Sequence, residues 1–169
     1  MKEKLISKLK RYSIETLKLL VIIIVMANVI SYLKRPELPS QTLPEIEATL
    51  IDNRAFTTAS VKGEPLMIHF WATWCPTCKT EAGNIDWVAN HFSVLSIAVK
   101  SGSNTQLSTY MKERDLTFKV LNDEMGLSDR FSVAAYPTTF IYDSEGNLAF
   151  TEVGYTSAIG LYLRIWWAK

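Results

Sequence analysis

The hydrophobic positions of this chain form one long stretch near its beginning and a series of short runs further on. Between residues 17 and 33 the chain reads LKLLVIIIVMANVISYL, and only Lys18, Asn28 and Ser31 interrupt the apolar pattern. A helix of about 20 such residues, rising about 1.5 Å per residue, covers a hydrocarbon core of about 30 Å. Because the stretch is not amphipathic, residues 14–33 are predicted to form a transmembrane helix and not a buried core helix.

Basic side chains are distributed unevenly on the two sides of this stretch. They are Lys2, Lys4, Lys8, Lys10 and Arg11 before it, and Lys34 and Arg35 after it. The larger positive cluster stays in the cytoplasm, so residues 1–13 are predicted to be a cytoplasmic basic segment and the body of the protein to face outward. A signal peptide cleaved after Ala27 is the alternative, and it places that body in the same compartment.

Short apolar runs bounded by turn residues follow a linker at 34–44 that contains three prolines. The folded domain is predicted to span residues 45–169. Strands are predicted at 66–71, 94–99, 117–121, 138–142 and 148–153, and helices at 76–90, 104–114, 125–131 and from 157 onward. Strands that alternate with helices and end in a hairpin and a helix predict an α/β domain with a mixed central sheet flanked by helices.

Composition narrows the class of protein further. Residues 36–169 carry ten basic and fifteen acidic side chains, and an acidic body without a basic stripe argues against nucleic-acid binding. An apolar fraction of 48% excludes wholesale disorder. The chain has only two cysteines, which excludes a four-cysteine zinc site, a cysteine-ligated iron–sulfur cluster and a disulfide-stapled miniature fold.

The two cysteines, Cys75 and Cys78, lie three residues apart where a predicted strand gives way to a predicted helix. At the start of a helix, unpaired N–H groups and the positive end of the dipole stabilise a Cys75 thiolate. Cys78 lies one turn further along and can resolve a mixed disulfide formed by Cys75. A structural disulfide would close only a four-residue loop and add little stability, so a redox-active pair is predicted.

A binding protein is the alternative that these residues leave open. Soft thiolates suit Cu(I), so Cys75 and Cys78, with His69, are candidate ligands of a copper or zinc chaperone. No cluster of methionine or histidine accompanies the cysteines, and no metal site is predicted.

The string FWATWCPTC at 70–78 resembles the active-site segment of the thioredoxin superfamily. It is most similar to the membrane-anchored TlpA/ResA-type thiol–disulfide oxidoreductases, and the layout is also similar to the anchored suppressor-for-copper-sensitivity protein D group. The resemblance covers residues 45–165. It implies a thioredoxin fold and a protein thiol–disulfide oxidoreductase that needs no cofactor, because electrons travel as dithiol and disulfide.

The same resemblance assigns roles to further residues. Tyr136 and Pro137 resemble the cis-proline loop that faces the cysteines and binds substrate backbone. Glu81 resembles the acidic residue beside the dithiol of this branch, although an exposed, merely solvated side chain on a helical turn is the alternative. Trp74 is expected to flank the sulfur and to contact substrate. The stretch 101–130 resembles an extra strand–helix insertion of the same branch.

His69 is a departure from the thioredoxin pattern, which has a buried acid six residues before the first cysteine. A neutral imidazole could accept the Cys78 proton during resolution of a mixed disulfide. The alternative is a core histidine whose hydrogen bonds are satisfied on a buried strand. Trp166 and Trp167 fit either core packing or an interface, and the sequence does not decide between these.

The sequence therefore predicts a thiol–disulfide oxidoreductase tethered to the bacterial inner membrane by one helix, with its catalytic domain in the periplasm. It is expected to act as a monomer on cysteine-containing periplasmic proteins. A reductase is favoured, and the resemblance implies that a DsbD-type membrane electron donor recharges it. Pro76 after the first cysteine is compatible with either direction of electron flow.

Overall fold

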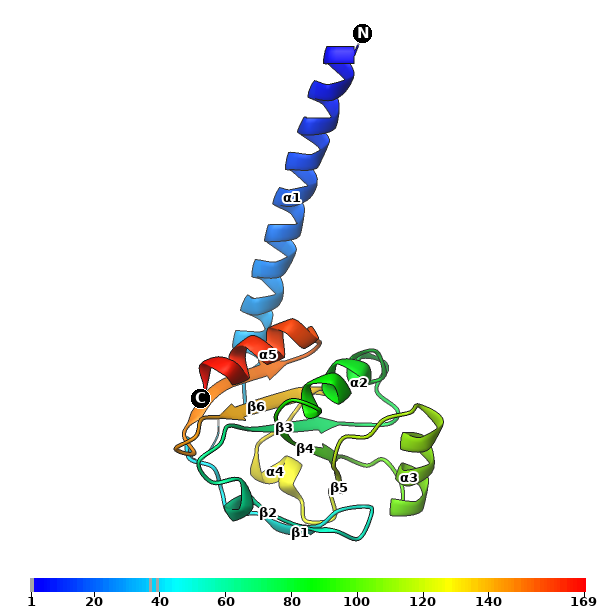
Figure 1. Cartoon of the computed structure of the whole chain (residues 1–169), viewed down its shortest axis with the longest axis vertical. Helices are drawn as coiled ribbons and strands as arrows, with labels where there is room; N and C mark the ends of the chain where they lie inside the picture. Colours follow the sequence, from blue (N-terminus) through cyan, green and yellow to red (C-terminus); the bar gives the residue numbers. More distant parts are fainter. Residues whose placement is uncertain (1, 37, 39) are drawn as a thin grey trace. The chain divides into compact units, whose positions relative to one another are not determined.

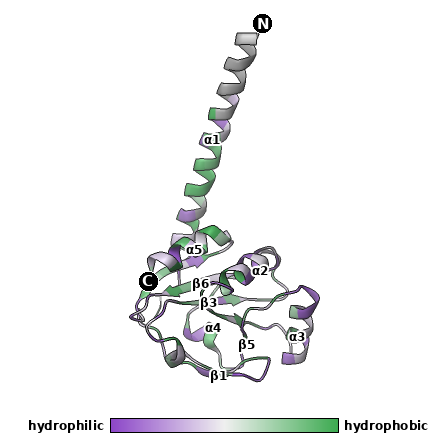
Figure 2. Ribbon diagram, in the orientation of Figure 1, coloured by the Kyte–Doolittle hydropathy of each residue, from purple (hydrophilic) through white to green (hydrophobic). Residues whose placement is uncertain are grey.

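The computed structural model describes residues 2–36, 38 and 40–169, and it consists of a helical unit that ends at Lys34 and a folded unit from Arg35 to Lys169. The first unit is the helix α1 (Lys2–Leu33). Its segment Ile14–Leu33 is long and apolar enough to cross a membrane, and Figure 2 shows this part of α1 mostly in hydrophobic colours. The predicted segments 1–13 and 34–44 include Met1, Glu37 and Pro39, which lie outside the described residues.

The folded unit is built on a mixed sheet of five strands in the order β5-β4-β3-β6-β7 (Figure 1). These strands are β3 (Leu66–Trp71), β4 (Ser93–Ala98), β5 (Val120–Asn122), β6 (Thr138–Tyr142) and β7 (Leu148–Val153). The pairs β3–β4 and β4–β5 are parallel, whereas β3–β6 and β6–β7 are antiparallel. This arrangement confirms the predicted mixed sheet.

Two layers of helices and loops cover the two faces of the sheet. The elements are β1 (Glu47–Thr49), β2 (Ala55–Thr57), the 3-10 helix η1 (Thr58–Val61), α2 (Pro76–Ala89), α3 (Asn104–Glu113), α4 (Leu127–Arg130) and α5 (Ala158–Trp167). Buried side chains of α2, α3 and α5 form one core cluster with Met67 and Trp71 of β3. Ile68 and Phe70 point to the opposite face, where they pack against the β1–β2 region and α4. The alternation along β3 therefore places the dithiol helix and α5 on the same side of the sheet.

The strand β5 begins at Val120 and not at residue 117 as predicted. The backbone N–H groups of Thr117 and Phe118 both donate to Oδ1 of Asp86 on α2, at 2.5 Å and 3.2 Å. Backbone groups held by a side chain of the helix layer are not available to a neighbouring strand, so the ladder starts later. The short antiparallel pair β1–β2 was not predicted, because three-residue strands leave almost no periodicity in a sequence.

Candidate active site

Cys75 lies at the junction of the β3 loop and α2, where it is the N-cap residue of the helix. Its Sγ accepts the backbone N–H of Cys78 at 3.3 Å. Pro76 occupies the first helical position, which suits proline because its fixed φ matches a helix and the N–H it lacks has no partner there anyway. The sulfur therefore faces free N–H groups and the positive end of the α2 dipole, which stabilise a thiolate.

The loop before β6 brings a second backbone group to the same sulfur. The Cys75 thiol donates a hydrogen bond to the carbonyl oxygen of Tyr136 at 3.5 Å. The Tyr136–Pro137 peptide bond is cis, and Pro137 is buried. The structure thus places Tyr136 and Pro137 beside the dithiol, and their role in binding substrate stays a prediction.

Trp74 forms an open aromatic wall next to Cys75. Its ring meets the ring of Tyr136 edge-on, with 5.7 Å between centroids and 89° between planes. Its Nε1–H donates to the carbonyl oxygen of Lys100 at 3.1 Å, which fixes the orientation of the indole. With 55% of the residue exposed, this wall is available to an incoming polypeptide.

Glu81 lies one turn of α2 beyond Cys78, and its side chain is completely buried. The alternative of a solvated side chain on an exposed turn is therefore wrong, because the segment between β7 and α5 lies against this part of α2, where Asn84 also donates to the Thr156 carbonyl oxygen. Glu81 Oε1 accepts the N–H of Thr156 at 2.7 Å, while Oε2 has no partner among the described residues. Burial raises the pKa of Glu81 to about 8, although the Thr156 N–H opposes this shift.

The environment of Cys78 differs from that of Cys75. Burial raises the pKa of the Cys78 thiol, and its hydrogen bond with Cys75 and the negative charge of Glu81 raise it further. Cys78 thus keeps its proton while Cys75 attacks, and it needs a base before it can attack in turn. Glu81 is close enough for its charge to raise the pKa of Cys78. Its own pKa of about 8 lies close enough to neutral pH for it to serve as this base.

His69 lies in the middle of β3, is 2% exposed and points to the same side of the sheet as Met67 and Trp71. Its Nδ1 shares a hydrogen bond with Oγ1 of Thr139 at 2.9 Å. Burial lowers the pKa of His69 to about 3, so the imidazole is neutral at pH 7. Among the hydrogen bonds of the described residues, none joins His69 to a cysteine, and its role as proton acceptor stays a prediction.

Because the His69 imidazole is buried and neutral, we expect its contribution to the stability of the folded protein to depend on pH. Between pH 6.5 and 3 the unfolded chain takes up a proton at His69 that the folded chain does not, so stability falls as the pH falls. From pH 7 to pH 5 this loss is about 2 kcal/mol. Urea unfolding of the full chain in mild detergent should show that the stability of the wild type relative to His69→Gln falls by about this amount over the same pH range, because the opposite contribution of Glu81 is common to both proteins. The exposed His91 supplies a matched control, His91→Gln, which should keep the wild-type pH dependence.

Tyr110 on α3 is a candidate that sequence reasoning did not identify. Its buried hydroxyl has no hydrogen-bond partner among the residues that the structure describes, and its ring lies 5.5 Å from that of Trp71. Burial raises the pKa of Tyr110; the Arg114 charge opposes this shift, whereas Cys78 and Cys75 add to it. The sequence shows only an aromatic residue three positions after Leu107 on an apolar helix face, which is also what a plain core residue would show.

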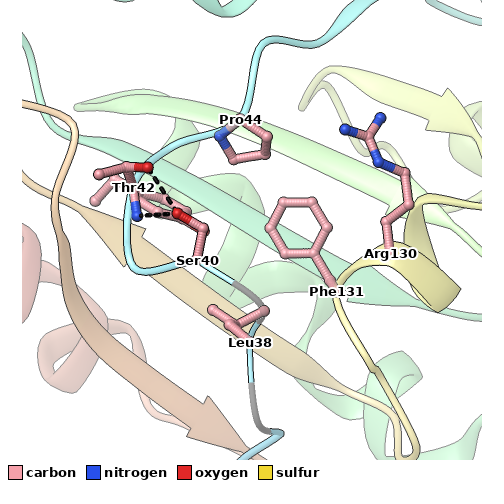
Figure 3. Close-up of a pocket in the computed structure, with 7 residues that line it drawn as sticks. Leu38, Ser40, Thr42, Pro44, Arg130 and Phe131 are labelled. Carbon is pink, nitrogen blue, oxygen red and sulfur yellow. Dashed lines mark hydrogen bonds between the residues drawn. The ribbon is translucent and has the colours of Figure 1, made fainter.

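A pocket of about 170 Å³ lies on the other side of the sheet, lined by Leu38, Ser40, Thr42, Pro44, Arg130, Phe131 and Tyr142 (Figure 3). Phe131 and Tyr142 belong to the core cluster opposite the dithiol. None of the described residues that line the pocket has a thiol, imidazole or carboxylate, so these residues offer no group for the chemistry of the cysteines. In the described part of the chain, no group of three His, Cys, Asp or Glu side chains is placed to hold a metal ion.

A thioredoxin-type sheet with a Cys-x-x-Cys pair at a helix start, facing a cis-proline loop, defines a thiol–disulfide oxidoreductase. The chain belongs to the AhpC/TSA family, whose model matches residues 39–151. Within the thioredoxin superfamily it fits the TlpA/ResA type, which confirms the resemblance drawn from residues 70–78.

Individual relatives agree with this assignment. A thioredoxin-like protein of Haemophilus influenzae is 27% identical over 165 residues, covering 96% of this chain and 98% of its own. Sporulation thiol-disulfide oxidoreductase A of Bacillus subtilis is 29% identical over 101 residues, covering 55% of this chain and 61% of its own. The crystal structure of a thiol:disulfide interchange protein from Chlorobium tepidum matches with a TM-score of 0.68 and 25% identity, over 78% of this chain and 98% of that one.

Proposed function

We propose that this protein is a membrane-tethered reductase that transfers two electrons from its dithiol to disulfides of periplasmic proteins. The observation that carries the proposal is the placement of Cys75 Sγ. This sulfur lies at the start of α2, where it accepts the Cys78 N–H and lies beside the Tyr136 carbonyl, whereas Cys78 and Glu81 lie further along the same helix. The Cys75 sulfur is thus placed to attack a substrate disulfide, and the Cys78 sulfur to resolve the mixed disulfide that forms.

The reaction proceeds in two exchanges. The Cys75 thiolate attacks one sulfur of the substrate disulfide, a mixed disulfide forms, and the second substrate sulfur leaves as a thiolate. Glu81 then takes the Cys78 proton, and the Cys78 sulfur attacks Cys75. This step closes the Cys75–Cys78 disulfide and releases the other substrate sulfur, so the substrate has gained two electrons and the protein has lost two.

The direction of electron flow is inferred from the side chains around the two sulfurs. A strongly oxidising dithiol owes its potential to a stabilised reduced form. Among the described residues, the hydrogen-bond partners of Cys75 Sγ are two backbone groups and the Cys78 thiol, with no histidine, lysine or arginine side chain. Buried Cys78 gains no stabilisation as a thiolate either, because its pKa is raised. A low potential, and hence electron donation, is favoured.

The location is inferred from α1. The segment Ile14–Leu33 meets the length and composition of a membrane span, and the larger cluster of basic residues precedes it. By the positive-inside rule the domain faces the periplasm of a bacterial cell. In that oxidising compartment a monomeric reductase needs electrons from the membrane, so the proposed donor is a DsbD-type transporter and the proposed substrates are cysteine-containing proteins.

The proposal is tested by trapping the redox state in cells together with fractionation. Alkylation of acid-quenched cells should show Cys75 and Cys78 mostly reduced, in a protein that stays with membranes after carbonate washing. The purified couple should have a potential nearer to the about −270 mV of thioredoxin than to the about −120 mV of a strong oxidant. A protein found oxidised in cells, with a potential near the higher value, would be an oxidase, and recovery in the soluble fraction would contradict the anchor.

A further inference from the structure

The outer face of α5, defined here as Ile159, Leu163, Trp166 and Trp167, is exposed although it is apolar. These residues are 70%, 55%, 57% and 77% exposed. They recur at helical spacing and so lie on one side of the helix, whereas Leu161 and Ile165 on the other side are fully buried. A helix that is apolar around its whole circumference is normally covered on all sides. Something other than water is therefore expected to cover the outer face of α5.

The helix α5 carries no acidic residue, although Asp143 and Glu145 line a pocket together with Trp167 at its end. Arg164 is the only charged residue of α5, and its Nε donates to Oε1 of Glu152 at 2.8 Å. Lys169 follows the helix, with its Nζ 5.3 Å from the centre of the Phe92 ring. No acidic residue occurs between Thr156 and Lys169. An apolar face that ends in two indoles matches the boundary between lipid headgroups and acyl chains, where tryptophan is enriched.

A bilayer is also within reach of this face if α1 spans the membrane, and the inference rests on that part of the proposed function. Residues 34–41 separate the end of α1 from Thr42, which pairs with Asn147 of the folded unit. Such a segment can extend at most about 30 Å. A domain of this size is about 35 Å across, so the tether keeps it within one domain diameter of the membrane. Tethering at this range raises the effective concentration of the surface and makes a modest apolar face sufficient for docking.

We propose that the outer face of α5 docks on the periplasmic surface of the bilayer, with Trp166 and Trp167 at the level of the lipid headgroups. Burial of Leu161 and Ile165 joins α5 to the same core as Cys78 and Ile85 of α2. Docking of α5 therefore holds the dithiol helix in a fixed orientation above the membrane. The tether limits the distance to the bilayer, and the docked helix sets which side of the domain faces it.

The test uses the full chain in vesicles of phosphatidylcholine and phosphatidylglycerol, compared with vesicles whose acyl chains carry bromine near the headgroup. All five tryptophans lie outside α1, so their fluorescence reports on the domain alone. Bromine quenches only indoles that reach the lipid. Wild-type protein should lose emission in brominated vesicles, and the loss should fall by at least about threefold in Ile159→Ser/Leu163→Ser, which removes the apolar side chains and keeps both indoles.

Met125 provides a matched control, because it is 50% exposed and lies in the loop between β5 and α4. Met125→Ser should be quenched like the wild type, and both serine variants should reduce a model disulfide at the wild-type rate. Protein that floats with the vesicles but shows no quenching overturns the docking and leaves the anchor intact. Quenching equal in Ile159→Ser/Leu163→Ser and wild type overturns it as well. If the emission changes only when the protein-to-lipid ratio is raised, and does not respond to bromine, the outer face of α5 contacts a second copy of the chain and not the bilayer. Protein that does not float with the vesicles contradicts both the anchor and the docking.

Discussion

Cys78→Ser is expected to leave the protein covalently joined to its substrates, whereas Cys75→Ser is expected to form no such complexes. Cys75 is the residue at the start of α2 whose sulfur accepts a backbone N–H, so it attacks first. Without the Cys78 thiol the mixed disulfide has no internal attacker and persists. Turnover should be lost in both variants, and only the pattern of trapped complexes separates the two cysteines.

The measurement is electrophoresis of alkylated membrane fractions without reductant, followed by the same samples with reductant. Thr80→Ser supplies the control, because Thr80 is exposed on α2 and keeps a hydroxyl after substitution. It should behave as the wild type. Equal amounts of complexes in Cys75→Ser and Cys78→Ser would contradict the order of attack.

Glu81→Gln is expected to slow the reaction and to stabilise the fold at alkaline pH. If Glu81 takes the Cys78 proton, its loss slows resolution by about 100-fold, within the range of general base catalysis. The raised pKa of about 8 means that the folded protein holds a proton at Glu81 that the unfolded chain releases above pH 4.5. The contribution of Glu81 to stability therefore falls as the pH rises, so the wild type should lose about 3 kcal/mol relative to Glu81→Gln between pH 5.5 and 8.5.

The two effects are measured by stopped-flow resolution of a preformed mixed disulfide and by urea unfolding, each as a function of pH. In the wild type the resolution rate should increase with pH toward about 8, where the carboxyl ionises. Glu113→Gln removes a carboxylate from the exposed face of α3 and should change neither profile. A slow reaction with an unchanged pH profile in Glu81→Gln would indicate a packing role and not proton transfer.

Strands and helices were predicted well where their apolar runs are buried on both sides. The runs at 66–71 and 138–142 coincide with β3 and β6, because continuous burial gives each of these strands a clear beginning and end. The run at 148–153 coincides with β7, an edge strand that is only partly buried and whose start is marked by the turn residues before it. The predicted bounds were less accurate where a side chain that is distant in the sequence determines where a strand begins. The start of β5 depends on Asp86, which lies 31 residues earlier in the chain than Thr117.

The residues of the candidate site also fall into those with a local sequence pattern and those whose environment depends on distant parts of the chain. Cys75, Cys78 and the Tyr136–Pro137 loop carry local patterns, and the structure brings them together. The burial of Glu81 could not be predicted, because it depends on the Thr156 backbone 75 residues later. The proximity of Tyr110 to the cysteines likewise depends on how α3 packs against Trp71.

The loop that follows β4 supports the rim of the site without taking part in its chemistry. The Lys100 carbonyl accepts the Trp74 indole N–H, and Oγ of Ser101 accepts the backbone N–H of Thr73 at 3.0 Å. The predicted contact between Trp74 and substrate therefore depends on a loop that carries no redox group. Mutations in this loop are expected to change the orientation of Trp74 while the sulfurs and Glu81 stay unchanged, so substrate preference can diverge under selection independently of redox potential.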